Sequence, residues 1–192
     1  MKDFQIEKTA ELYDEKYYWQ LVKESVRFST TQFGQEEYLI GRLLHYSPHD
    51  LIGFRLLTDR LVHDAHSSEL WCAARIMNNG CGDDAFEYFK CWVISRGEEV
   101  YKNAVKDPDT LVTEIQVGRR WYEFELFWYA PNNAFKMLTG KDLYSYVDYE
   151  KRGSKMDIYP NYYKLEFNWD ERDVDSIRAI CPNLYAAFSR TD

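Results

Sequence analysis

Apolar side chains recur every three or four positions along most of the chain, and this period constrains the fold more than any other feature of the sequence. It is clearest in Phe86, Phe89 and Val93, whose spacing places three side chains on one helical face. Capping residues come before such segments, and Gly or Pro follows them. With 45% hydrophobic and 17% aromatic residues, the chain has ample apolar surface for a core. The pattern predicts a mainly α fold.

The period and its stop signals predict a bundle-like array of about seven to nine helices. Aromatic residues 121–129 fit a helix or a strand, and Pro131 is expected to end or kink a helix there. The other helices are expected over 13–28, 33–46, from Ser47-Pro48 onward, 69–78, from Asp83 to Gly97, from Glu98 to Asp107, 109–115, 171–180 after a cap at Asp170, and 183–188.

Residues 141–165 interrupt this helical pattern with many Tyr residues and mixed charges. We expect an insert near the C-terminus that forms a loop or a short β-hairpin, with strands near 144–147 and 163–167. No internal repeat and no linker rich in Gly, Ser or Pro divides the chain. The sequence therefore predicts a single domain over 1–192.

Charge and cysteine content exclude several functional classes. The chain has 32 acidic and 24 basic residues, a net charge of −8, which argues against broad nucleic-acid binding through phosphate neutralisation. No apolar run approaches the roughly 20 residues that cross a bilayer, so no membrane partner is expected. The four Cys residues form no CxxC pair and no zinc-finger spacing. We expect reduced thiols and a cytoplasmic protein.

A set of motifs runs through the second half of the chain: LWxAA (70–74), NGCxDDxFxxFxxWxISxG (79–97), DPDxL (107–111), WDExD (169–173) and CPxLYxxF (181–188). Together they resemble the bacterial family named domain of unknown function 4240. The resemblance implies a small, mostly helical bacterial domain, and it supplies no catalytic residue. The Tyr-rich insert is longer here than in the common family pattern.

Asp83 and Asp84 are the first candidate site. Adjacent carboxylates after a tight turn can bind a metal ion or serve as general acid and base. Alternatively, Asp83 caps the following helix and Asp84 stabilises its first turn. Nearby cationic side chains that would pair with them are Arg75, Lys90 and Arg96.

The four His residues form two pairs, His45 with His49 and His63 with His66. His63 and His66 lie three positions apart and would share one helical face, so a metal site with Asp83 and Asp84 is one interpretation. The other is polar surface or helix-end histidine, because no HExxH motif is present. The chain also lacks the GxSxG, Walker and dinucleotide-binding motifs, so no cofactor and no catalytic residue are predicted.

The aromatic residues divide into two sets. Trp71 has helical spacing typical of the core, yet it flanks the acidic turn and is also a candidate binding residue. The Tyr residues of the insert have no period that would bury them, and Tyr is favoured in binding surfaces. This second set comprises Tyr144, Tyr146, Tyr149, Tyr159, Tyr162 and Tyr163.

Three functional hypotheses follow. The first is a protein-interaction protein, for example an immunity or antitoxin-like protein whose acidic, Tyr-rich face neutralises a basic toxin. The second is a metal-dependent hydrolase or nuclease-like enzyme that uses Asp83 and Asp84 with His63 and His66. The third is an intracellular regulatory or small-molecule-binding module.

Overall fold

The computed structural model describes residues 5–153 and 164–189, and its regular secondary structure in these ranges is helical. Two compact units are present, and each is described by itself. Unit 1 comprises Met1–Leu61 and Glu125–Pro160, and unit 2 comprises Val62–Phe124 and Asn161–Asp192. This division does not test the single domain over 1–192 that the sequence predicts, so the single domain stays a prediction.

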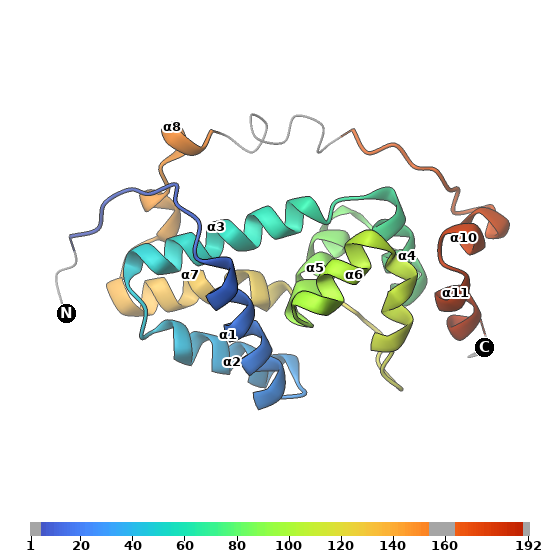
Figure 1. Ribbon diagram of the computed structural model, residues 1–192, viewed down its shortest axis with the longest axis horizontal. Helices are drawn as coiled ribbons and strands as arrows, with labels where there is room; N and C mark the ends of the chain where they lie inside the picture. Colours follow the sequence, from blue (N-terminus) through green and yellow to red (C-terminus); the bar gives the residue numbers. More distant parts are fainter. Residues whose placement is uncertain (1–4, 154–163, 190–192) are drawn as a thin grey trace. The chain divides into compact units, whose positions relative to one another are not determined.

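Unit 1 is built around α1, α2, α3 and α7, with α2 in contact with both α1 and α7 (Figure 1). Its helices are α1 (Glu15–Phe28), α2 (Gln32–Leu43), α3 (Pro48–Asp64, whose last turn belongs to unit 2), α7 (Glu125–Thr139), the 3-10 helix η2 (Leu143–Tyr146) and α8 (Tyr149–Arg152). Two predicted starts are confirmed. The Asp14 carboxylate caps α1 by accepting from the amides of Lys16 and Tyr17, and the Ser47 hydroxyl accepts from the amide of Asp50 in α3.

Pro131 lies inside α7, where the sequence predicted a break or kink. Proline in a helix interior removes one hydrogen bond and costs about 3 kcal/mol. In α7 its neighbours Phe127, Ala130, Ala134 and Phe135 are all buried, as is Pro131 itself. The helix continues to Thr139 because the packing of this apolar face outweighs the local cost of the proline.

Unit 2 contains α4 (Ser68–Asn78), α5 (Asp83–Ser95), α6 (Glu98–Lys106), the 3-10 helix η1 (Pro108–Glu114), α10 (Val174–Ile180) and α11 (Pro182–Phe188). The predicted Asn79-Gly80 stop is confirmed. Asn79 takes the left-handed conformation with φ of 52°, and the Gly80 amide donates to the Arg75 carbonyl at 2.9 Å. The predicted core face of α5 is also confirmed, since Phe86, Phe89 and Val93 are fully buried.

The predicted β-hairpin is wrong for the residues that the structure describes. Residues 143–146 form η2, because Leu143 and Val147, four positions apart, are the two that point into the core. Val147 forms only an isolated parallel bridge with Thr9. Residues 164–167 have no regular structure, and Tyr163 lies outside the described residues.

The helices outnumber the seven to nine predicted, because short helices such as η2 and α8 are single turns that no sequence period reveals. Helix α10, predicted over 171–180, also begins later than predicted, at Val174. Asp173, rather than Asp170, caps α10 by accepting from the amides of Asp175 and Ser176. The predicted final turn over 183–188 is confirmed as α11.

Asp109 in η1 fixes the start of α11. The side chain of the N-cap residue, Cys181, makes no capping hydrogen bond to this helix. Instead the Asp109 carboxylate, 7% exposed, accepts from the amide of Leu184 at 2.8 Å and from the amide and side chain of Asn183 at 3.1 and 2.7 Å. A carboxylate at a helix N-terminus accepts hydrogen bonds from the free amides, and its negative charge interacts favourably with the helix dipole. The DPDxL and CPxLYxxF motifs therefore meet in one contact.

Replacing Asp109 with Ala is expected to lower the free energy of unfolding by about 2–3 kcal/mol, because it leaves buried donors without an acceptor. Urea denaturation followed by tryptophan fluorescence measures the change. Asp175→Ala is the control, since that carboxylate is exposed on α10 and its loss should cost about 0.5 kcal/mol or less. Equal losses in the two variants would contradict the proposed role of Asp109.

Candidate functional site

Arg55 is a buried cation within α3, in unit 1. Its side chain is 5% exposed, and its Nε donates to Asp59 Oδ1 at 2.9 Å. Its Nη1 donates to the Trp128 carbonyl at 2.8 Å and to Asn132 Oδ1 at 3.3 Å, both on α7. These bonds join α3 to α7 and hold the guanidinium in one place.

Asp59 forms ion pairs with two arginines, Arg55 and Arg152. Its Oδ1 also accepts from the indole nitrogen of Trp128 at 2.8 Å, and its Oδ2 lies 3.6 Å from Nη1 of Arg152 in α8. The side chains of Asp59 and Arg152 are 18% and 16% exposed. Two guanidinium groups therefore share one carboxylate, which leaves a local excess of one positive charge under little solvent screening.

Aromatic rings surround this pair. The guanidinium carbon of Arg55 lies 4.8 Å from the ring centroid of Trp128, 5.3 Å from that of Tyr144 and 5.8 Å from that of Tyr129. Tyr129, Tyr144 and Tyr149 are 38%, 36% and 51% exposed. We name Tyr129, Tyr144, Tyr149 and Arg152 the tyrosine–arginine surface. Partial burial raises the pKa of Tyr144 and of Tyr149, so both hydroxyls stay protonated at neutral pH and can donate hydrogen bonds.

The structure thus gathers only part of the predicted Tyr set. Tyr144 and Tyr149 lie at the same arginine cluster. Tyr146 packs elsewhere in unit 1, with its ring 5.8 Å from that of Phe135. Tyr159, Tyr162 and Tyr163 lie outside the described residues.

Arg55, Asp59 and Arg152 were not predicted to form one site. One signal in the sequence could have found the first two: Arg55 interrupts the apolar run of α3, and Asp59 follows four positions later, where a helical ion pair forms. No local signal connects them to Arg152, which the fold supplies from a segment 93 positions further along the chain.

Asp83 and Asp84 are both exposed in the first turn of α5. The prediction that Asp83 caps this helix is wrong. Gly82 has the extended backbone of the N-cap and its carbonyl accepts from the Phe86 amide at 2.9 Å, so Asp83 is already the first helical residue. Both carboxylates complement the helix dipole. The expected cations pair with other acids: Arg75 with Glu171, Lys90 with Glu87, and Arg96 with Glu114.

The predicted His and Asp metal set gains no support from the part of the chain that the structure describes, where no group of three or more His, Cys, Asp or Glu is arranged to hold a metal ion. His66 lies beyond the end of α3, and its Nδ1 is 3.1 Å from the buried Lys90 Nζ. Lys90 also donates to Glu87 at 3.0 Å. An ammonium beside this ring nitrogen opposes binding of a metal cation there.

Trp71 packs in unit 2 as its spacing predicted. Its ring stacks on that of Phe86 with centroids 4.5 Å apart, and its indole nitrogen donates to the Cys81 carbonyl at 3.1 Å. The four cysteines are free thiols, and three of them are buried. Burial raises the pKa of the fourth, Cys81, to about 12, so this thiol stays protonated at neutral pH.

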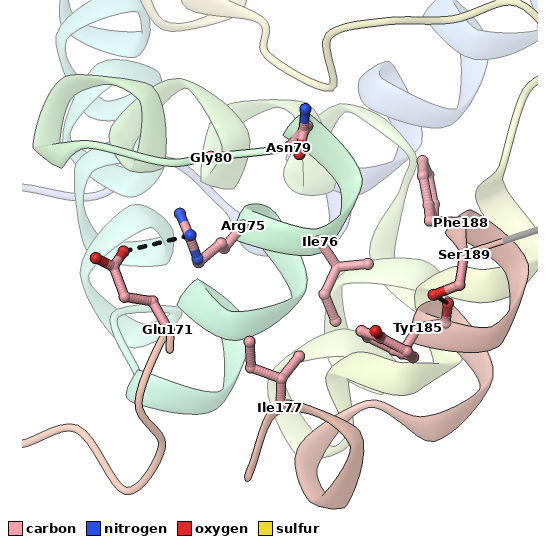
Figure 2. Close-up of a pocket in the computed structure, with 9 residues that line it drawn as sticks. All are labelled: Arg75, Ile76, Asn79, Gly80, Glu171, Ile177, Tyr185, Phe188 and Ser189. Atoms are coloured by element: carbon pink, nitrogen blue, oxygen red, sulfur yellow. Dashed lines mark hydrogen bonds and ion pairs between the residues drawn. The ribbon is translucent and has the colours of Figure 1, made fainter. Parts of the chain in front are cut away.

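Unit 2 also has a pocket of about 210 Å³ between α4 and the C-terminal segment. Figure 2 shows Arg75 and Glu171 on one side of it and Ile76 and Ile177 in the middle. On the other side lie Tyr185 and Phe188 of α11 and its C-cap residue Ser189. The Arg75 and Glu171 side chains form an ion pair at 3.4 Å. The pocket therefore combines charges of both signs with an apolar floor.

Residues 13–137 match the family described as "Protein of unknown function (DUF4240)". The chain belongs to this family. Neither a curated protein nor a solved structure matches it. The matched range of this DUF4240 member includes Arg55 and Asp59 but ends before Arg152 and before the C-terminal half of the pocket. No helix in residues 5–153 or 164–189 is long and apolar enough to cross a membrane.

Asp59→Asn is expected to lower the free energy of unfolding by about 3 kcal/mol, because Arg55 and Arg152 lose their shared counter-charge while Arg55 stays buried. Chemical denaturation measures the change. Glu98→Gln is the matched control, since the Glu98–Lys102 pair is exposed and its loss should cost about 0.5 kcal/mol or less. A near-neutral Asp59→Asn variant would show that the arginine pair does not depend on this carboxylate.

Proposed function

We propose that this DUF4240 member is a protein-interaction protein and that the tyrosine–arginine surface binds its partner. The observation that carries the proposal is the arrangement of exposed tyrosines around Arg55 and Arg152, which both pair with Asp59. Tyr and Arg, with Trp, are the residue types that dominate binding energy at protein interfaces.

Rigidity favours this role. Arg55 is fixed by Asp59, Trp128 and Asn132, and its guanidinium supports the rings of Tyr129 and Tyr144. Side chains that are already ordered lose less conformational entropy when a partner binds. The Tyr rings supply large apolar area, and their hydroxyls supply donors at the edge.

The local charge indicates what the partner offers at this surface. Arg55 and Arg152 share the Asp59 carboxylate, so these three groups carry one positive charge in excess, although Asp142 also acts on Tyr149 and the whole chain is acidic. A partner that presents an Asp or Glu side chain to Arg152 would complete the charge balance. Arg152, with the weaker 3.6 Å contact, is the residue better placed to exchange Asp59 for a partner carboxylate.

Photo-crosslinking tests the proposal in cells of the source organism. A benzophenone amino acid in place of Tyr149 should capture a protein that the same group in place of Tyr17 does not. Tyr17 is a matched control, because it is a tyrosine on α1 of the same unit with 53% exposure against 51% for Tyr149.

With the captured protein purified, Tyr149→Ala should weaken binding at least about tenfold, since it removes an interface tyrosine. Tyr17→Ala should change the dissociation constant less than about twofold. Calorimetric titration gives both values. Equal effects of the two substitutions, or the same adducts from both crosslinking positions, would exclude the tyrosine–arginine surface as the binding site.

Charge distribution favours a second form of this role, an immunity or antitoxin-like protein that neutralises a basic toxin. Unit 2 holds 17 of the 32 acidic residues and 11 of the 24 basic ones, a net charge of −6 against −2 for unit 1. Asp83 and Asp84 are exposed and form no ion pair with another described residue. Both would attract a basic protein.

The toxin hypothesis predicts a specific kinetic effect with a basic protein encoded by a neighbouring gene. Replacing Asp83 and Asp84 with Asn should slow association several-fold at low salt and change dissociation little, because exposed charges act mainly on encounter. Surface plasmon resonance at two salt concentrations measures both rates. No binding of such a protein, or an association rate that salt does not change, would exclude this form of the role.

The metal-dependent hydrolase stays a prediction without support from the geometry. A divalent-ion screen by thermal shift, together with metal analysis of the Asp84→Ala variant, tests it directly.

A further inference from the structure

The pocket of unit 2 plays no part in the interaction proposed above, and its chemistry differs from that of the tyrosine–arginine surface. Its volume of about 210 Å³ lies below the roughly 300–1,000 Å³ of pockets that hold drug-sized ligands, so it suits a smaller molecule such as one amino acid.

One side of the pocket carries a separable pair of opposite charges. Arg75 Nη2 and Glu171 Oε2 lie 3.4 Å apart, and their side chains are 33% and 57% exposed. Such partly exposed pairs contribute little free energy. Among the described residues, each is the other's only ion-pair partner. A ligand can therefore replace either partner at low cost.

Three apolar side chains also line the pocket. Ile177 is buried, and Ile76 and Phe188 are half-buried, so the pocket offers contacts to an aliphatic or aromatic group. The Ser189 hydroxyl already donates to the Tyr185 carbonyl at 2.8 Å. Asn79 also lines the pocket with an exposed polar side chain, while Arg75 and Glu171 are its charged lining residues.

We propose that this pocket binds a free α-amino acid with an apolar side chain. The ligand carboxylate pairs with Arg75, its ammonium pairs with Glu171, and its side chain lies against Ile76, Ile177 and Phe188. Figure 2 shows Ile76 and Ile177 between the Arg75–Glu171 pair and Phe188.

A zwitterion fits better than a singly charged ligand. A simple carboxylate at Arg75 would face the like charge of Glu171, and a simple amine at Glu171 would face Arg75. The pocket also lies at the C-terminal end of α4, where the helix carbonyls favour a positive group. An α-amino acid satisfies both charges while remaining neutral overall.

Titrations of the full chain with three probes test the ligand chemistry. L-phenylalanine should bind saturably and shift the NMR signals of the Ile76 and Ile177 methyl groups. N-acetyl-L-phenylalanine, which lacks the ammonium, and L-phenylalaninamide, which lacks the carboxylate, should each bind at least tenfold more weakly. An analogue that binds as well as L-phenylalanine, or shifts confined to other residues, would overturn the proposal.

Variants test the two charged residues. Arg75→Gln and Glu171→Gln should each weaken binding of L-phenylalanine at least tenfold, with circular dichroism confirming that both remain folded. Arg172→Gln is the matched control, because Arg172 is exposed beside Glu171 but does not line the pocket, and it should change affinity less than twofold. Should a charge variant fail to fold, the three probes on the unmodified chain still decide the question. Absence of saturable binding by the folded chain, or unchanged affinity in both charge variants, would overturn the proposal.

Discussion

The carboxylate of Asp109 is the contact on which the C-terminal part of unit 2 depends. The short helix α11 has seven residues and no capping side chain of its own, and isolated helices of this length are unstable in water. Asp109 supplies the missing acceptors from η1, where it is itself held by the turn that Asp107 and Pro108 begin. Since α11 lines the pocket, the geometry of the pocket follows from a cap that lies 74 positions away in the sequence.

Buried charge plays the corresponding part in unit 1. An isolated arginine inside a core would be strongly destabilising, so Arg55 requires Asp59 and the acceptors of α7. Those acceptors exist only when α7 runs unbroken past Pro131, because Trp128 and Asn132 lie on either side of it. Pro131 therefore disfavours α7 locally. Apolar packing and the hydrogen bonds from Arg55 to Trp128 and Asn132 stabilise the helix.

Sequence reasoning succeeded where a short segment contains its own signal. Caps at Asp14 and Ser47, the stop at Asn79 and the buried face of α5 all follow from neighbours within four positions. It failed where the outcome depends on distant packing, as for the residues now in η2 and for a helix end at Pro131, while a kink at Pro131 stays a prediction. The candidate site shows the same division: the exposed Tyr144 and Tyr149 were found by composition, whereas the arginines beneath them were not, because Arg152 meets Asp59 only through the fold.

The motifs noted in the sequence acquire a physical meaning from the contacts between them, although WDExD and CPxLYxxF lie beyond residues 13–137, the range that matches the family. DPDxL and CPxLYxxF contain the two ends of the Asp109 contact, while Glu171 of WDExD reaches back to Arg75 between LWxAA and NGC. In each case a C-terminal motif contacts a central one, so these motifs contain contacts that hold the C-terminal segment on the rest of unit 2. The Arg75–Glu171 pair lines the pocket between α4 and α11, and the Asp109 contact holds α11 at its start, so the pocket depends on both contacts. Ligand binding in unit 2 would then be linked to the stability of the C-terminal segment. A molecule that binds Arg75 and Glu171 together favours the state in which this segment contacts α4.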